Sequence, residues 1–219
     1  MYKCVAFDVD GVLTKVESAW QYVHERLNTW DKARVNMELY FNKKITYEEW
    51  AYLDALLWKG VSYDKFMEIF DSIPINDGFE KTLSRIKSLG LKIIAISGGL
   101  MPLLERLNKI VRFDDMYATE LIFENGIFTG KVIVHVKYGN KDLVLLNACK
   151  KHGFSTKECI VIGDSEIDIP MFAISGYSIA FNPKNQKVAK AANKVINSES
   201  LNPIADIIEE LLASSTSER

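Results

Sequence analysis

The feature that most constrains this chain is a set of short apolar segments that each run into small or acidic residues. The first covers residues 3–9 (KCVAFDV) and continues into Asp10 and Gly11, the second covers residues 91–97, and the third covers residues 158–162. Continuous apolar runs of this length are typical of strands buried on both faces of a parallel sheet. Because the carboxyl ends of parallel strands meet at one edge, we expect the polar residues after these runs to lie together.

Helical patterns separate these strands. Apolar residues recur at helical spacing in 79–89, where Asn76 and Asp77 are expected to cap the start and Gly90 the end. Further expected elements are helices at 100–109, 141–152 and around 204–212, a strand at 177–181, and a hairpin at 121–136 that turns at Glu124-Asn125-Gly126. The alternation predicts an α/β fold with a parallel sheet covered on both faces.

Residues 15–75, the helical insert, do not follow this alternation. Their apolar residues recur at helical spacing, and Thr46 and Glu49 form a capping-box pattern. The insert holds all four tryptophans and 12 of the 24 aromatic residues, so it buries a small aromatic core of its own or covers something. We favour the aromatic core over an aromatic ligand cage. The expected domains are therefore a core of residues 1–14 and 76–219 and the insert of residues 15–75.

Composition excludes several classes of function. The 27 basic and 29 acidic residues leave a net charge of −2, which argues against nucleic acid as a partner. The chain opens on a strand-like run instead of an export signal, and no apolar stretch approaches the length of a membrane span. Cys4, Cys149 and Cys159 lack the spacing of a disulfide framework or a zinc site. We expect a cytoplasmic protein without a membrane partner, working alone or as a homodimer.

Four aspartates stand at the expected strand ends. Asp8 and Asp10 lie two residues apart, so their side chains point the same way on an extended backbone, and Asp164 and Asp168 follow the third apolar run in GDSEID. Neighbouring carboxylates repel one another unless a cation intervenes, and oxygen ligands suit Mg²⁺. Each pair taken alone is equally compatible with capping of a helix or turn.

Two further polar features lie between these pairs. Ser97-Gly98-Gly99 follows the second apolar run and offers a hydroxyl and backbone amides at a turn that opens a helix, which is suited to a phosphate-sized anion. Lys141 begins the helix before the second aspartate pair. In isolation, a glycine-pair turn without a ligand and a solvated lysine are the more common interpretations.

The combination resembles a known family. FDVDGVLT at 7–14, ISGG at 96–99, Lys141 and GDSEID at 163–168 are similar to the four ordered motifs of the haloacid dehalogenase-like hydrolases, and the resemblance covers essentially the whole chain. The helical insert and the hairpin resemble the phosphoserine phosphatase branch. The resemblance implies a Rossmann-like three-layer core with a helical cap domain after the first strand, and a Mg²⁺-dependent phosphatase.

The resemblance also implies roles for the motif residues. Asp8 would be the nucleophile that becomes an aspartyl phosphate, Asp10 the acid and base, and Lys141 the group that neutralises the Asp8–phosphate pair. Mg²⁺ would be held by the Asp8 carboxylate, the Asp10 backbone carbonyl and Asp164, with Asp168 supporting these ligands. Ser97 and the Gly98 amide would hold the phosphoryl oxygens. Because Asp10 is present, dehalogenation is not expected.

The substrate is less constrained than the reaction. In the resembled branch a cap glutamate and a cap arginine recognise phosphoserine; Glu17 matches the glutamate, but Asp54 stands where the arginine is expected. A small phosphorylated metabolite with hydroxyl or amino groups is therefore favoured over one with a free carboxylate, unless Arg26 or Arg34 replaces the arginine. The alternatives are a phosphatase for phosphoglycolate, a sugar phosphate or pyridoxal phosphate, a phosphomutase, and a non-catalytic binding protein.

Overall fold

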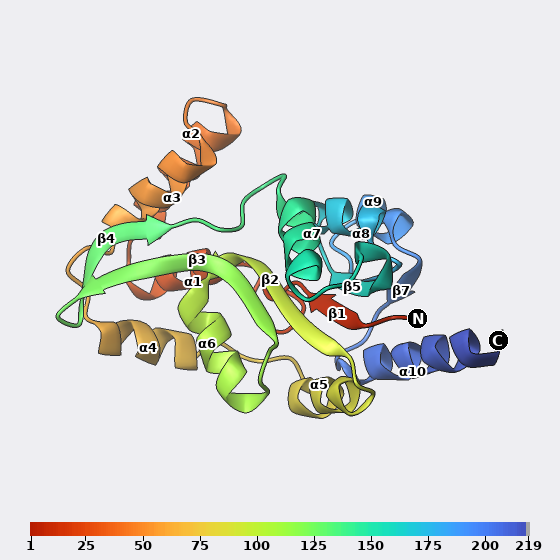
Figure 1. Cartoon of the computed structure of the whole chain (residues 1–219). Helices are drawn as coiled ribbons and strands as arrows, with labels where there is room; N and C mark the ends of the chain where they lie inside the picture. The colour runs from red at the N-terminus through yellow and green to blue at the C-terminus, as the bar shows by residue number, and fades with distance from the viewer. Residues whose placement is uncertain (218–219) are drawn as a thin grey trace.

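A seven-stranded sheet forms the centre of the computed structural model, which describes residues 1–217 (Figure 1). The strands lie in the order β4-β3-β2-β1-β5-β6-β7, and all neighbours are parallel except the β3–β4 pair. Their bounds are β1 Cys4–Phe7, β2 Lys92–Leu100, β3 Asp115–Glu124, β4 Ile127–Ile133, β5 Cys159–Gly163, β6 Tyr177–Phe181 and β7 Lys194–Ile196. The predicted parallel α/β sheet is thus confirmed, with β1 between β2 and β5.

Helices cover both faces of this sheet (Figure 1). One layer contains α5 (Phe79–Ser88), α6 (Met101–Ile110) and α10 (Asn202–Ser217), and the other contains α7 (Lys141–Lys151), α8 (Ile169–Ile174) and α9 (Gln186–Ala191). Short 3₁₀ turns at Thr156–Glu158 and Glu166–Asp168 flank β5. In the central strand Val5 and Phe7 join one buried cluster while Cys4 and Ala6 join the other. This period of two, with both faces buried, explains why the strands are continuously apolar in sequence.

The hairpin β3–β4 turns where the sequence predicts. Asn125 and Gly126 have φ angles of 50° and 76°, the left-handed pair that a two-residue hairpin turn requires. The first strand of the hairpin is longer than predicted, because Asp115, Met116 and Tyr117 pair in parallel with β2 before the chain reaches the hairpin. The hairpin is therefore an extension of the central sheet.

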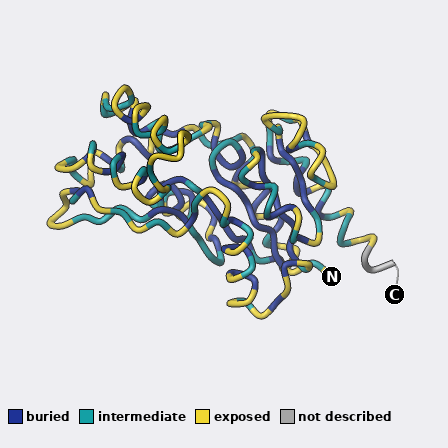
Figure 2. Tube along the Cα trace, turned by 90° about the horizontal axis from the view of Figure 1, so that it is seen from above, coloured by how far each residue is buried: buried dark blue, intermediate teal, exposed yellow. Residues whose placement is uncertain are grey.

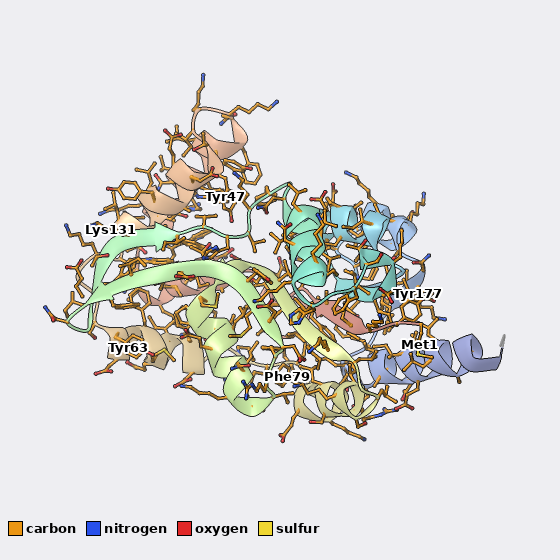
Figure 3. The ribbon with its side chains drawn as sticks, in the orientation of Figure 1. Met1, Tyr47, Tyr63, Phe79, Lys131 and Tyr177 are labelled. Atoms are coloured by element: carbon orange, nitrogen blue, oxygen red, sulfur yellow. The ribbon has the colours of Figure 1, made fainter. Side chains whose placement is uncertain are left out.

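The helical insert packs on both sides of this hairpin. Its helices are α1 (Ala19–Arg26), α2 (Trp30–Phe41), α3 (Tyr47–Leu56) and α4 (Tyr63–Asp71), and the predicted capping box at Thr46 and Glu49 is present. Figure 1 shows α3 and α4 on opposite sides of the β3–β4 ribbon. At the hairpin tip the Tyr63 amide donates to the Gly126 carbonyl at 2.8 Å, and Figure 3 shows Tyr63 there, at the start of α4.

Aromatic side chains join the insert to the rest of the molecule. Trp58, Phe66 and Phe70 are fully buried, and the Phe66 ring packs edge-on against Phe123 and Phe128 of the hairpin. These residues belong to the same buried cluster as the strands of the sheet, and Figure 2 shows buried residues continuing from the sheet into the insert. The expected separate aromatic core is wrong, because these rings pack against the hairpin and share one buried cluster with the sheet.

Two local predictions are also wrong. The residue that caps α5 is Gly78, with φ +77°, whereas the Asn76 side chain donates to the carbonyls of Val12 and Thr14. Residues 97–100 form no turn, since β2 continues through Gly98 and Gly99 with a register shift against β3. The glycines therefore place strand backbone beside the residues that follow β1, with Gly99 close to Asp10.

The three cysteines, distant in sequence, come together. Cys4 pairs with Cys159 in register across β1 and β5, and Cys149 of α7 covers the same face. Their sulfur atoms lie within 4.8 Å of one another, free and buried among apolar side chains. Sequence spacing carries no signal of this contact, because it is made by strand pairing.

Within residues 1–217, no helix has both the length and the apolar character needed to cross a membrane.

Candidate active site

Asp8 and Asp10 mark the carboxyl end of β1. Asp8 is 3% exposed, and its amide donates to the Ile162 carbonyl of β5 at 2.9 Å, which continues the sheet ladder to the site. Asp10 Oδ2 accepts from the Ala19 amide at 2.8 Å, at the start of α1, whereas Asp10 Oδ1 is buried without a partner. The carboxylates of Asp8 and Asp10 thus lie at the same strand end, and the buried Asp10 Oδ1 has no hydrogen-bond partner.

Lys141 joins the two motifs. Its side chain is 1% exposed and lies at the first residue of α7, from which Nζ donates to Asp8 Oδ1 and to Asp168 Oδ1, each at 2.7 Å. Asp168 Oδ2 accepts from the amides of Asp164 and Ser165 at 3.1 and 3.0 Å. Both oxygens of Asp168 are thus used within the protein, and this side chain fixes the loop that carries Asp164.

Asp164 completes the group at the end of β5. Its Oδ2 lies 3.4 Å from Lys184 Nζ, and its Oδ1 is buried without a partner. Gly11, with φ +81°, brings the first motif so close that an added Cβ would lie 2.2 Å from Asp164 Oδ2. Only glycine fits there, because the φ angle and the contact both exclude a side chain.

Burial and mutual repulsion perturb these acids. Burial raises the pKa of Asp10 to about 6, against the hydrogen bond from the Ala19 amide, which lowers it. Burial and the neighbouring Asp168 raise the pKa of Asp8, while Lys141 acts in the opposite sense. Burial would lower the pKa of Lys141, but Asp168 and Asp8 outweigh it and hold the pKa above its usual value. The lysine is therefore a fixed positive charge.

The group has the composition of a divalent-cation site. Only two ammonium groups, those of Lys141 and Lys184, lie among four carboxylates, those of Asp8, Asp10, Asp164 and Asp168. If all four are ionised, two negative charges remain uncompensated. Oxygens of Asp8, Asp164 and Asp168 lie within 4.8 Å of one another. Because Asp168 is fully hydrogen-bonded and Asp164 Oδ1 has no partner, Asp8 and Asp164 are the carboxylates that fit an oxygen-liganded ion such as Mg²⁺.

The middle strand supplies Ser97 and Gly98. Ser97 Oγ accepts from the Gly99 amide at 2.9 Å, and the Gly98 carbonyl accepts from Trp20 Nε1 at 3.1 Å. The hydroxyl proton of Ser97 points away from this bond, because the oxygen is the acceptor. Both residues border the same cavity as the aspartates, and so does Glu17, an exposed residue just before the N-cap of α1. Every site residue predicted from the sequence except Asp168 lines this cavity, and Asp168 lies directly behind it.

The cavity has a volume of about 420 Å³ and extends from the aspartates into the helical insert. Asp54 lies on its wall, so the position expected for a basic residue does face the cavity and is acidic. Arg26 is directed elsewhere, donating to the Tyr22 hydroxyl, and Arg34 pairs with Asp31 on the surface. Neither arginine takes the place of the expected cap arginine.

Sequence reasoning missed Lys184 and most of the cavity wall. Lys184 follows β6. Residues that follow parallel strands meet at one edge of the sheet, and this reasoning, which selected Asp8 and Asp164, also applies to Lys184. His24, Tyr47 and Tyr138 have no such signal, because α1, α3 and the loop after β4 meet only through tertiary packing.

Residues 2–176 match the model of a family described as haloacid dehalogenase-like hydrolases, and the chain belongs to this family. A phosphoserine phosphatase of Albidiferax ferrireducens is 26% identical over 215 residues, covering 95% of this chain and 90% of that protein. A solved phospho-aspartyl intermediate analogue of phosphoserine phosphatase has a TM-score of 0.78 at 23% identity, covering 94% of this chain and 98% of the other. The solved structure of a probable phosphoserine phosphatase from Vibrio cholerae has a TM-score of 0.85 at 17% identity. The match covers 98% of this chain and 67% of the other.

Proposed function

We propose that this hydrolase is a Mg²⁺-dependent phosphatase that transfers the phosphoryl group of a small phosphomonoester to Asp8 and then to water. The observation that carries the proposal is the Asp8 carboxylate itself, buried at the end of β1, bonded on one oxygen by Lys141 and adjacent to Asp10 and Asp164. The family membership and the relatives named as phosphoserine phosphatases support it.

In the first half-reaction an Asp8 oxygen attacks phosphorus, and the bond from phosphorus to the leaving oxygen breaks. Asp10 donates its proton to that oxygen, so the alcohol departs uncharged. In the second half-reaction Asp10 takes a proton from water, the water oxygen attacks phosphorus, and the bond to Asp8 breaks. General acid and base catalysis of this kind contributes about 10²–10⁴ in rate.

Positive charge allows the anionic phosphoryl group to approach Asp8. Lys141 already supplies one charge at 2.7 Å from the carboxylate. Mg²⁺ held by Asp8, Asp164 and the Asp10 backbone carbonyl would supply the rest, by neutralising charge between the carboxylate and the phosphoryl oxygens. Ser97 and the Gly98 amide are placed to bind the remaining phosphoryl oxygens, and Asp168 holds Lys141 and the Asp164 loop in position.

We assign residues 1–14 and 76–219 to the catalytic core and the helical insert to covering the site. The four motifs supply every group that touches phosphorus, whereas the wall farther from the aspartates is built from α1, α2 and α3. The insert would thus exclude water and recognise the alcohol part of the substrate.

The test is phosphate release from a chromogenic aryl phosphate with Mg²⁺, with excess chelator, and after Mg²⁺ is restored. Activity should disappear on chelation and return with the metal. Asp8→Asn should be inactive, whereas Asp142→Asn, one residue beyond Lys141, serves as the matched control. Full activity of Asp8→Asn would refute the nucleophile, and activity in chelator would refute the metal. No phosphate release from the aryl ester, together with isomerisation of a sugar phosphate, would indicate a phosphomutase, and no product from either ester a binding protein.

A further inference from the structure

The cavity above the aspartates has an aromatic wall. Six rings line it, and they come from α1, α2, α3 and the loop after β4: Trp20, Trp30, Phe41, Tyr47, Trp50 and Tyr138. Figure 3 shows Tyr47 at the start of α3, on the side of the helix that faces the loop between β4 and α7. A serine-sized leaving group has too little apolar surface to use six rings.

These rings are held in place by contacts with one another, with the end of β2 and with Trp58 behind the wall. Trp20 donates to the Gly98 carbonyl and stacks on buried Trp58, with ring centroids 5.1 Å apart. Trp50 packs edge-on to Tyr47 at 5.7 Å and lies nearly parallel to Tyr138 at 6.5 Å. Pre-positioned faces lose little conformational entropy when a ligand contacts them.

A carboxylate lies in this wall. Asp54 is 4% exposed, its Oδ1 accepts from Asn36 Nδ2 at 2.8 Å, and its Oδ2 lies 3.5 Å from His24 Nε2. Trp58 Nε1 can only donate, so its 3.0 Å bond makes His24 Nδ1 an acceptor and places the imidazole proton on Nε2. That proton points toward Asp54 over a distance too long for a good hydrogen bond.

No lysine or arginine of residues 1–217 forms an ion pair with Asp54. The three lysines that line the cavity are paired elsewhere: Lys141 with Asp8 and Asp168, Lys184 with Asp164, and Lys137 with Glu48. The wall also contains polar atoms. Trp50 Nε1 and His24 Nε2 are buried there without a hydrogen-bond partner. Buried N–H donors of this kind are costly unless water or another hydrogen-bond acceptor completes them.

Aromatic faces around a buried carboxylate that lacks a cation fit one class of ligand best. A carboxylate on the substrate would be repelled by Asp54, a polyol would need more hydrogen-bonding side chains, and a neutral ring would leave Asp54 without a charge partner. A positive charge on nitrogen is attracted both by the ring faces and by the carboxylate.

We propose that the preferred substrate is a phosphomonoester of a cationic alcohol, with a quaternary ammonium or alkylated ring nitrogen held between the aromatic wall and Asp54. The proposal rests on the phosphatase function and assigns the leaving group of that same site. It makes Asp54 a determinant of specificity through direct contact with the substrate.

The test uses two pairs of substrates that differ only in charge. One pair is phosphocholine and its neutral analogue in which a tert-butyl group replaces the trimethylammonium group. The other is the phosphate ester of N-hydroxyethylpyridinium and that of phenylethanol. For at least one pair, kcat/KM should favour the cation by roughly 10- to 100-fold, as expected for a buried charged contact plus cation–π attraction.

Asp54→Asn keeps the shape and the oxygen that accepts from Asn36, and it should reduce this ratio to a few-fold. Asp31→Asn, the same change on the surface of α2, should leave the ratio unchanged. Ratios near one in both pairs of wild-type enzyme, or an unchanged ratio in Asp54→Asn, would overturn the proposal.

Binding separates this proposal from the phosphatase function. With Mg²⁺ and beryllium fluoride present, quenching of tryptophan fluorescence should report tighter binding of choline than of its tert-butyl analogue, or of the pyridinium alcohol than of phenylethanol. Equal affinities in both pairs would refute the cationic subsite even if aryl phosphates are hydrolysed. Cation-selective binding without hydrolysis of any phosphomonoester would refute the phosphatase and retain the subsite.

Discussion

Gly11→Ala tests whether close approach of the first motif sets the position of Asp164. Two costs arise from the added Cβ. At φ +81° a non-glycine residue costs about 1–2 kcal/mol in unfolding free energy. The Cβ would also lie 2.2 Å from Asp164 Oδ2, so the carboxylate must retreat by 0.8 Å to reach 3.0 Å, the shortest separation found for real Cβ atoms.

The second cost should appear in the affinity for Mg²⁺. Metal–ligand distances are defined to about 0.2 Å, so a displacement of 0.8 Å would take Asp164 out of reach of the Mg²⁺ that we propose it binds. Mutating residues that only hydrogen-bond to metal ligands typically lowers the metal affinity about 10- to 100-fold. We expect at least that loss of Mg²⁺ affinity in Gly11→Ala. The assay is the Mg²⁺ concentration that gives half-maximal aryl phosphatase activity.

Gly60→Ala is the matched control. Gly60 has φ +91°, and no atom lies within 4 Å of its added Cβ, so it carries the backbone strain alone. Gly60→Ala should lose only the backbone share of the unfolding free energy in urea and keep the wild-type Mg²⁺ requirement, whereas Gly11→Ala should need more Mg²⁺. If both variants reach half-maximal activity at the same Mg²⁺ concentration, the proposal that Asp164 binds Mg²⁺ and is positioned by its contact with Gly11 is wrong.

Three other outcomes are expected. Lys141→Met strands two buried carboxylates and should lower the unfolding free energy by about 3–5 kcal/mol in urea titrations, whereas Lys150→Met on the exposed side of the same helix should change it little. Phe66→Ala should cost about 3–5 kcal/mol because it empties the contact between the insert and the hairpin; the exposed Tyr52→Ala is the comparison, and equal losses would show that this contact contributes nothing. Beryllium fluoride with Mg²⁺ should change tryptophan emission, since three of the four tryptophans line the cavity, and unaltered emission and quencher access would argue against closure of the insert.

Local patterns in the sequence predicted most elements correctly. The capping box of α3 and the Asn125-Gly126 turn are decided within a few residues, so the sequence contains all the chemistry they need. The same holds for the carboxylates at the ends of β1 and β5, because the apolar run indicates the strand and the aspartate that follows indicates its carboxyl end. Their meeting at one edge follows from parallel pairing.

Predictions failed where distant segments supplied the partner. Asn76 was expected to cap α5, but its amide is used by the carbonyls of Val12 and Thr14, residues that no local pattern connects to it. Gly98 and Gly99 were expected to turn, but they lie inside β2 at its register shift against β3, and the Gly98 carbonyl accepts from Trp20 Nε1 of α1. In both cases a tertiary hydrogen-bond partner outweighs the local preference of the residue.

The sequence by itself thus determined the sheet, its catalytic edge and the order of the four motifs, because each depends on short apolar runs and the residues that end them. Only the tertiary structure decided what lies above that edge. His24 lies on α1, Asp54 and Trp58 lie at the end of α3 and just after it, and Tyr138 lies in the loop after β4. Their contacts require four helices to close around a hairpin, and no periodicity along one helix specifies which side chains of another it will meet.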